Sequence, residues 1–387
     1  MFSAKLRQRQ DEEPQALRRA QLATDDSPRI LFHAASMGEL EQCIPVVHAL
    51  QSLVPIAKFW ASCSSPSGYT HAQNLTEFTE ALYSPIDTKI NVTAFINAVR
   101  PNVVVINRYD VWPHFVEEVN RRGIPLHLMN ATMPSAGKNI LLGRWMKQVY
   151  QKISNIYAVS ERDAEELTTF LGRNITAMPD TRVDRVLERL ATVDESIAAL
   201  RRADVTTLVV GSSWPADEDL TIQSLSSFDE GALRLIIVPH EPTSSALARI
   251  ENLLPIKRLS SASASTHGHI LVDEVGRLLS LYSIADAAFV GGGFGAGVHS
   301  VTEPAGYGIP IASGPKIDRS RHALTLQHAG ALRCIEDSLD LKTWLITAVL
   351  DETSRVSIGA QARNSITDTA GSSLRYATMI AQSITDR

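Results

Sequence analysis

Short apolar runs alternate with longer segments of helical spacing from one end of the chain to the other. Short runs rich in Val, Ile and Ala are typical of strands that are covered on both faces of a parallel sheet. Such runs occupy residues 30–34, 57–62, 102–106, 126–129 and 156–159 in the first half, and residues 207–210, 235–238, 270–272, 287–290 and 310–312 in the second. Helical patterns between them cover residues 40–53, 115–122, 161–171 and 274–285. This order predicts an α/β protein with two Rossmann-like, doubly wound parallel sheets.

The domain boundaries follow from a polar, helix-prone stretch at 188–204 that separates the two halves. We expect an N-terminal segment (1–29), a first Rossmann-like domain (30–190) and a second one (205–387). The length of 387 residues exceeds one ordinary core, which agrees with two domains. Ligands of such sheets bind beyond the carboxyl ends of the strands. We therefore expect the two domains to face each other across a ligand-binding cleft.

Composition narrows the class of protein. The chain is 44% hydrophobic and 20% charged, as a globular protein is, and its net charge of -5 argues against nucleic-acid binding. Cys43, Cys63 and Cys334 form no CxxC pair, which excludes a zinc ribbon and fits a reducing compartment. No run approaches the ~18 apolar residues that span a bilayer. The first 29 residues also lack the apolar core of a signal peptide, so we expect a cytoplasmic protein.

The most informative stretch is GGGFGAGVHSVTEPAGYGIP at 291–310. It follows an apolar strand and leads into a predicted helix, so bare glycine amides and a helix N-terminus are expected to meet where a phosphate binds. Glu303 stands where a carboxylate can accept two ribose hydroxyls. The spacing is not the GxGxxG of dinucleotide enzymes, and an ordinary tight turn is the alternative.

Candidate chemistry in the first half follows two predicted strands. In HAASMGE at 33–39, Ser36 and Glu39 have the spacing of a capping box. Glu39 is alternatively a general base at the mouth of the cleft, with Gly38 leaving room for a sugar. In NRYDVWP at 107–113, Asp110 faces the cleft or belongs to a loop in which Trp112 fills the core.

Further along, DTRVDR at 180–185 places Arg182 near the domain boundary, where an arginine suits an acidic ligand or simply a solvated turn. In the second half, Ser212 and Ser213 follow a strand and suit phosphate. We interpret the acidic triplet at 217–219 as helix-start acids rather than metal ligands. His240 and Glu241 are expected to line the nucleotide side of the cleft, since Ser244 replaces the second histidine of a zinc motif.

One segment, residues 138–152, is predicted to form a basic amphipathic helix. Lysines and arginines surround the apolar side chains of Leu141, Leu142, Trp145, Met146 and Val149. Such a helix either docks on an anionic membrane surface or packs on its own domain with solvated lysines.

Taken in order, the motifs resemble the 3-deoxy-D-manno-octulosonic acid (Kdo) transferases from about residue 30 to 335. They are HAASMGE (33–39), NRYDVWP (107–113), NATMP (130–134), VSERD (159–163), PDTRVDRV (179–186), GSSWPADED (211–219), VPHEP (238–242), VGRLLSLYSIADAAFVGGGF (275–294) and GVHSVTEPAGYGIPIASGP (297–315).

The resemblance implies a GT-B glycosyltransferase that moves Kdo from CMP-Kdo to a lipid A precursor at the cytoplasmic face of the bacterial inner membrane. It implies inversion, no metal and no cofactor, with an acceptor-binding first domain and a donor-binding second domain. Glu39 would be the base, and Ser36, Gly38 and Asp110 would lie on the acceptor side. Arg182 would meet the donor's charge. The donor nucleotide would be held by Ser212, Ser213, His240, Glu241, Val275, Gly276, Gly293, Gly295, Gly297, His299 and Glu303.

Several positions depart from the family pattern. Pro239 stands where many members have arginine, Ser300 replaces asparagine, Asp110 replaces glutamate, and Pro179 replaces glycine. The family's N-terminal membrane helix has no counterpart here, so either the sequence is truncated or membrane docking relies on a surface helix. Two alternatives stay open. One is another GT-B enzyme, such as a UDP-sugar transferase or a UDP-N-acetylglucosamine 2-epimerase. The other is a non-catalytic relative that binds a sugar nucleotide.

Overall fold

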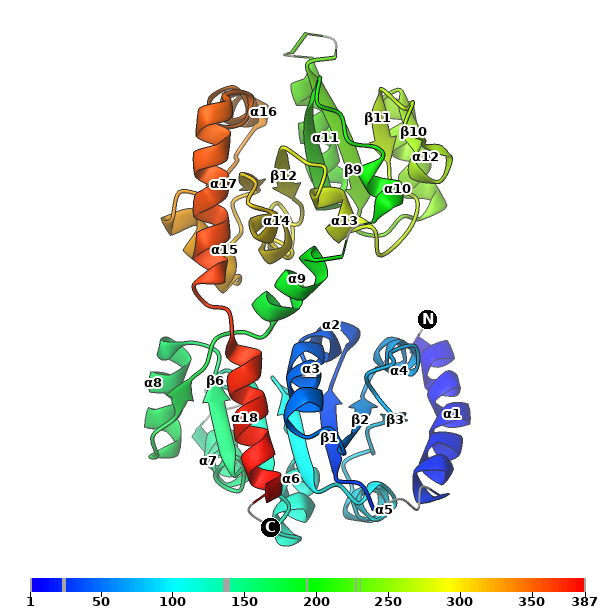
Figure 1. Cartoon of the computed structure of the whole chain (residues 1–387), viewed down its shortest axis with the longest axis vertical. Helices are drawn as coiled ribbons and strands as arrows, with labels where there is room; N and C mark the ends of the chain where they lie inside the picture. Colours follow the sequence, from blue (N-terminus) through cyan, green and yellow to red (C-terminus); the bar gives the residue numbers. More distant parts are fainter. Residues whose placement is uncertain are drawn as a thin grey trace. The chain divides into compact units, whose positions relative to one another are not determined.

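The computed structural model describes residues 2–22, 26–134, 140–192, 194–226, 228–229 and 231–385. The chain divides into two compact units (Figure 1). Unit 1 comprises residues 1–185 and 370–387, and unit 2 comprises residues 186–369. The sequence prediction placed residues 370–387 in the second domain, whereas their helix packs in unit 1. The N-terminal segment is also part of unit 1, because its helix buries Ala16 and Ala20 in that core.

Unit 1 is built on a seven-stranded sheet of order β3-β2-β1-β4-β5-β6-β7, in which every pairing is parallel. The strands are β1 (Arg29–Ala34), β2 (Lys58–Cys63), β3 (Glu80–Tyr83), β4 (Val103–Asn107), β5 (Leu126–Ala131), β6 (Asn155–Ala158) and β7 (Thr176–Ala177). β1, β4 and β5 are buried along their whole length. That burial on both faces explains their unbroken apolar runs.

Helices cover both faces of this sheet. They are α1 (Phe2–Leu22), α2 (Met37–Glu41), α3 (Ile44–Leu53), α4 (Pro66–Gln73), α5 (Lys89–Val99), α6 (Pro113–Arg121), α7 (Ile140–Gln151), α8 (Glu161–Leu171) and α18 (Ser372–Thr385), with α9 (Arg182–Leu190) crossing the boundary of the units. The single helix predicted over 40–53 is interrupted at Gln42 and Cys43, because Pro45 has no N–H and crowds the carbonyl of Glu41.

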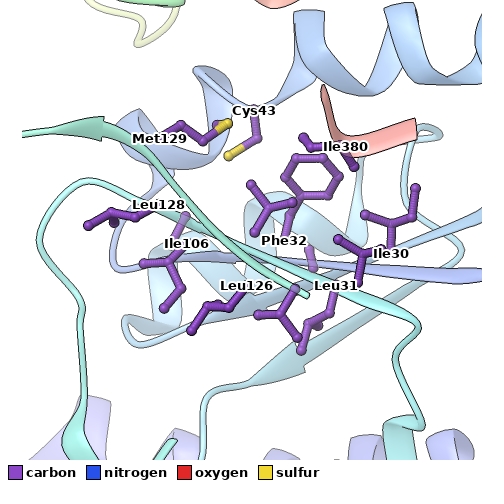
Figure 2. Packing of buried hydrophobic residues seen from close by; sticks show 14 of the residues in the cluster. Ile30, Leu31, Phe32, Cys43, Ile106, Leu126, Leu128, Met129 and Ile380 are labelled. Carbon is purple, nitrogen blue, oxygen red and sulfur yellow. The ribbon is translucent and has the colours of Figure 1, made fainter. Parts of the chain in front are cut away.

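The core of unit 1 joins segments that are far apart in the sequence. Figure 2 shows Ile380 from the C-terminal helix α18 among strand residues such as Leu31, Phe32 and Ile106. Each of these side chains is fully buried. The chain therefore returns to unit 1 at its end, and α18 packs beside α3.

Unit 2 repeats the architecture with a second parallel sheet of order β10-β11-β9-β8-β12-β13-β14. Its strands are β8 (Thr206–Ser213), β9 (Leu233–Pro239), β10 (Ile256–Arg258), β11 (His269–Leu271), β12 (Ala287–Val290), β13 (Ile311–Ser313) and β14 (Leu332–Cys334). Its helices are α10 (Glu195–Ala198), α11 (Pro215–Leu225), α12 (Ser244–Leu253), η2 (Leu259–Ser261), α13 (Leu278–Tyr282), α14 (Thr302–Tyr307), α15 (Arg321–His328), α16 (Ser338–Trp344), the π-helical η3 (Leu345–Leu350) and α17 (Glu352–Thr367).

One helix of unit 2 is shorter than predicted. The pattern at 274–285 indicated a long helix, but α13 covers only Leu278–Tyr282. Gly276 has a φ of +85°, a left-handed conformation that a continuous helix cannot contain. The polypeptide before α13 is therefore an exposed turn, and this places Val275 and Gly276 on the surface.

Strand order identifies where each sheet binds ligands. In unit 1 the order reverses between β1 and β4, and in unit 2 it reverses between β8 and β12. Open parallel sheets bind ligands in the crevice beyond the carboxyl ends of the strands at such a switch point. The predicted site residues follow these four strands in large part. Glu39 and Asp110 come after β1 and β4, the serine pair forms the carboxyl end of β8, and the glycine run comes after β12.

Candidate active site

The turn after β1 holds Glu39 by two hydrogen bonds. Ser36 has an extended backbone and caps α2, its hydroxyl accepting from the N–H of Glu39 at 3.4 Å. The Glu39 carboxylate in return accepts from the N–H of Ala35 at 2.8 Å. These two bonds resemble the reciprocal pair of a capping box, except that the carboxylate accepts from Ala35, one residue before the N-cap Ser36. At Gly38 a Cβ would meet nothing within 4 Å, so the space above the turn is open.

The surroundings of Glu39 make it a better base than an ordinary glutamate. Burial raises the pKa of its carboxyl, and the negative charge of Asp110 raises it further. The hydrogen bond from Ala35 and the charges of Arg108 and His33 act in the opposite direction, but the pKa remains raised. A raised pKa strengthens a carboxylate as a proton acceptor.

Asp110, the other candidate carboxylate, is bound from several sides. It accepts from Ser64 Oγ at 2.5 Å and pairs with His33 Nε2 at 3.0 Å. The second ring nitrogen of His33 contacts Ser62 Oγ at 2.8 Å. Burial acts to raise the pKa of Asp110, but the hydrogen bonds from His33, Ser64 and Trp112 outweigh it and the pKa is lowered. A carboxylate so stabilised is a weak base, and we interpret Asp110 as the group that orients His33 and Trp112.

A buried amide network lies beneath these two carboxylates. Asn107 donates to the carbonyl of Glu39 at 2.7 Å, and Asn130 donates to Asn107 and Thr181 at 2.9 and 3.0 Å. Arg108 and Asn130 have φ values of +65° and +51°, which are uncommon outside glycine and gather at functional sites. This network was not predicted from the sequence. Its only signal was polar residues at the carboxyl ends of two buried strands.

Arg182 is positioned by the start of α9. Its backbone N–H donates to Asp180 Oδ1 at 2.9 Å, and the other oxygen of Asp180 accepts from Arg108 at 2.5 Å. Within the described residues the Arg182 guanidinium makes no hydrogen bond or ion pair. A cation that is anchored through its backbone and otherwise uncommitted suits an anionic ligand.

In unit 2, β8 ends in a strained turn. Ser212 has a φ of +50° and is half-buried. The next hydroxyl, that of Ser213, is buried and donates to Glu218 Oε1 at 2.9 Å. Ser213 is thus occupied within the protein, whereas Ser212 is the serine of this pair that reaches the surface. Glu218 also pairs with Arg249, so the acidic triplet has an internal role. Nowhere in the described part of the chain does a group of His, Cys, Asp and Glu side chains suit a metal ion.

The glycine run after β12 forms a tightly folded loop. The N–H groups of Gly295 and Gly297 donate to the carbonyl of Gly292, at 2.9 and 3.1 Å. The Gly292 N–H donates to Asp217 Oδ2 at 3.0 Å, and that oxygen also accepts from Trp214 N at 2.9 Å. The expectation of bare amides is therefore wrong for these three glycines. Asp217, predicted from the sequence to be a helix-start acid, connects this loop to the β8 turn through these two hydrogen bonds.

Three aromatic rings lie where the β8 turn, the β9 turn and the glycine loop converge. His240 stacks on His299 with ring centroids 4.3 Å apart and on Trp214 at 5.0 Å. Trp214 donates its indole N–H to His299 Nε2 at 3.0 Å. We call Trp214, His240 and His299 the ring cluster. Burial and the neighbouring His240 lower the pKa of His299.

Glu303 is the second residue of α14 and is half-buried. Its charge contributes, after burial, to the raised pKa values of Tyr282 and Tyr307. Glu241 and Val275 are exposed, the latter by 81%. Unit 2 therefore brings Ser212, His240 and His299 to one edge of its sheet, with Glu303 following the glycine loop.

Comparison with known proteins relates the chain to one family. A family model for 3-deoxy-D-manno-octulosonic-acid transferase (Kdo transferase) matches residues 5–185. The Kdo transferase of Chlamydophila psittaci is 26% identical over 84% of this chain and 78% of its own length. That of Haemophilus influenzae is 25% identical over 74% of this chain and 70% of its own. The resemblance found in the motifs is thereby confirmed.

Solved structures identify the fold. A UDP-N-acetylglucosamine 2-epimerase superimposes with a TM-score of 0.65 and 11% identity, covering 94% of this chain and 98% of the epimerase. MurG from Acinetobacter baumannii gives a TM-score of 0.58 at 12% identity, covering 92% of this chain and 99% of MurG. The predicted fold class, two Rossmann-like domains of the GT-B type, is confirmed.

Proposed function

We propose that this relative of the Kdo transferases is itself a glycosyltransferase that moves Kdo from CMP-Kdo to a lipid A precursor. The observation that carries the proposal is Glu39. It lies in a motif shared with that family, at the switch point of the sheet, with a raised carboxyl pKa and open space beside it. The relatedness to enzymes named Kdo transferases supports the choice of sugar.

The proposed reaction is a single inverting displacement. An acceptor hydroxyl gives its proton to the Glu39 carboxylate while its oxygen forms a bond to the anomeric carbon of Kdo. The bond from that carbon to the phosphate oxygen breaks, and CMP leaves with the electron pair. CMP is a good leaving group, so the chemistry needs a base and fixed donors for the departing phosphate rather than a metal.

Unit 2 is proposed to bind the nucleotide. Ser212, His240 and His299 would meet phosphate or carboxylate oxygens, and Glu303 would accept the ribose hydroxyls. Glu241, the backbone of Val275 and Gly276, and the loop containing Gly293, Gly295 and Gly297 complete the proposed surface. In unit 1, Arg182 would meet the donor's negative charge, and Ser36, Gly38 and Asp110 would frame the acceptor.

The structural likeness to UDP-N-acetylglucosamine 2-epimerases keeps a second function in view, that of a UDP-sugar enzyme. Calorimetric titration with CMP and with UDP separates the two. A Kdo transferase should bind CMP more tightly than UDP. Preference for UDP would support the second function.

Removing the Glu303 carboxylate should weaken nucleotide binding. Charge-assisted hydrogen bonds are worth about 1.5–3 kcal/mol each, so Glu303→Ala is expected to lower CMP affinity by at least tenfold with the melting temperature nearly unchanged. Glu336→Ala, at an exposed acid of the same unit, is the control and should bind CMP normally. Unchanged affinity in Glu303→Ala would show that the ribose is held elsewhere.

We further propose peripheral binding to the cytoplasmic face of the inner membrane. None of the helices in the described part of the chain is long and apolar enough to cross a bilayer. Of the basic amphipathic segment, residues 138 and 139 and the side chains of Leu141 and Leu142 lie outside the described part. Met146 and Val149 pack on the core of unit 1, which uses much of the apolar face internally. Trp145 remains 48% exposed beside the exposed Arg144.

Membrane binding through the exposed Arg144 and Trp145 should depend on salt concentration. Binding to vesicles of anionic lipid should weaken as ionic strength rises, and Arg144→Glu with Trp145→Ser should reduce it severalfold in flotation assays. Neutral phosphatidylcholine vesicles provide the control. If the double variant floats with anionic vesicles as the parent does, α7 is not the docking surface.

A further inference from the structure

The ring cluster contains a hydrogen bond whose direction fixes a proton. An indole N–H can only donate, so His299 Nε2, 3.0 Å from Trp214 Nε1, must present its lone pair. A protonated imidazolium would carry a proton on Nε2 and confront the indole N–H. His299 is therefore neutral, and its single ring proton lies on Nδ1.

The rest of the environment agrees with a neutral ring. Burial lowers the pKa of His299, and the neighbouring ring of His240, which stacks on it, lowers this pKa further. Two charged groups of the neighbouring elements are already engaged, and the carboxylate of Glu241, next to His240, is exposed. Asp217 accepts from Gly292 and Trp214, and Lys316 Nζ donates to the carbonyls of Phe294 and Gly295.

The Nδ1 proton has no acceptor among the described residues. The Nε2 and Cδ2 edge of the ring lies over Gly292, where an added Cβ would come within 3.1 Å of Nε2. The backbone N–H of His299 donates to the carbonyl of Gly291 at 3.1 Å, which fixes the position of the residue. Nδ1 makes no hydrogen bond within the described chain and is not among its buried unpartnered atoms. It is a fixed donor that is open to a ligand.

We propose that Trp214 is a positioning residue for the nucleotide donor, because it holds His299 in the Nδ1–H tautomer and presents that N–H to an anionic oxygen of CMP. This inference rests on the proposed function for the identity of the ligand. The orientation of the proton rests only on the ring cluster. His299 then binds the anion as a neutral donor, and its contribution to affinity does not require protonation.

The proton position can be observed directly. In the full chain labelled with ¹⁵N-histidine, long-range ¹H–¹⁵N correlation should show His299 with Nδ1 protonated and Nε2 bare, its signal being assigned by its loss in His299→Gln. Trp214→Phe keeps an aromatic ring and removes the N–H. In that variant the tautomers should mix and the pKa of His299 should rise, because the bond that favoured the neutral ring is gone. If the wild-type spectrum shows the His299 proton on Nε2, that result alone overturns the inference.

Binding supplies the second readout. Trp214→Phe and His299→Gln should each weaken CMP binding by about tenfold, as expected for the loss of a hydrogen bond to a charged group. The double variant should be no weaker than His299→Gln alone, because Trp214 acts through His299. His328→Gln, at an exposed histidine of the same unit, is the control. Additive losses, or normal CMP affinity in Trp214→Phe, would overturn the positioning role. Failure of the wild-type chain to bind CMP would instead overturn the proposed function and, with it, the identity of the ligand.

Discussion

Replacing Glu39 by glutamine should lower the turnover of Kdo transfer by about 10² to 10⁴, the usual contribution of a general base. CMP affinity should stay near that of the parent, because the Glu39 carboxylate makes none of the proposed contacts with the nucleotide. Glutamine keeps the side-chain length and an oxygen that can accept from the Ala35 N–H. Turnover and CMP titration on the same preparation separate the two effects.

The stability of this variant distinguishes catalysis from capping. The pKa of Glu39 is raised in the folded chain, so the folded state holds its proton to higher pH than the unfolded state does. Ionisation of this group therefore costs stability as pH rises through the folded pKa. At neutral pH, Glu39→Gln should melt no lower than the parent. A variant that melts several degrees lower yet transfers Kdo at the normal rate would assign Glu39 to capping alone.

Comparing Asp110→Asn with Glu39→Gln tests which of the two carboxylates is the base. The pKa of Asp110 is lowered by its three hydrogen-bonding neighbours, so its loss should disturb the orientation of His33 more than it removes a base. The acid limb of the parent's pH–rate profile should lie above the ordinary glutamate value, because Glu39 must be ionised to act. That limb should persist in Asp110→Asn and vanish in Glu39→Gln.

Gly293→Ala should be strongly damaging to unit 2. A Cβ there would lie 2.5 to 2.7 Å from backbone atoms of Gly314, and backbone on both sides leaves no flexible side chain to move. Overpacking of this kind costs about 1–3 kcal/mol or more, and the displaced loop should lose CMP binding. Thermal melting and calorimetry measure the two consequences.

Gly295→Ala is the matched control for that substitution. Its Cβ would meet nothing nearer than the carbonyl oxygen of Gly292 at 3.6 Å, an ordinary contact. It should melt within about a degree or two of the parent. Equal losses of melting temperature in the two variants would mean that the close approach of Gly293 and Gly314 does not hold the loop.

The predicted strands show what a single sequence reveals about such a fold. All ten predicted runs correspond to strands within a residue or a few at either end. The four strands that were missed, β3, β7, β10 and β14, are the two edges of each sheet. Interior strands are buried on both faces and need unbroken apolar runs, whereas edge strands are short and partly solvated. A pattern of hydrophobicity therefore detects the middle of a sheet better than its margins.

The sequence predicted the local motifs of the site but not the distant residues that bond to them. Glycines, serines and acids after strands were visible as local motifs, but their partners were not. The hydrogen bonds from Gly292 to Asp217 and from Trp214 to His299 join residues 75 and 85 positions apart, and no local spacing encodes them. Ser213 shows the converse error. It stands at the carboxyl end of a strand, as a ligand-binding serine should, yet its hydroxyl is buried against Glu218.

The most direct test of the proposed activity is to incubate the purified chain with CMP-Kdo and a lipid A precursor and to follow the acceptor by mass spectrometry. The account predicts an acceptor heavier by one or more Kdo residues, release of CMP in equal amount, and no such product from Glu39→Gln over the same time. Release of CMP without any gain in acceptor mass, or equal product from the parent and Glu39→Gln, would contradict it.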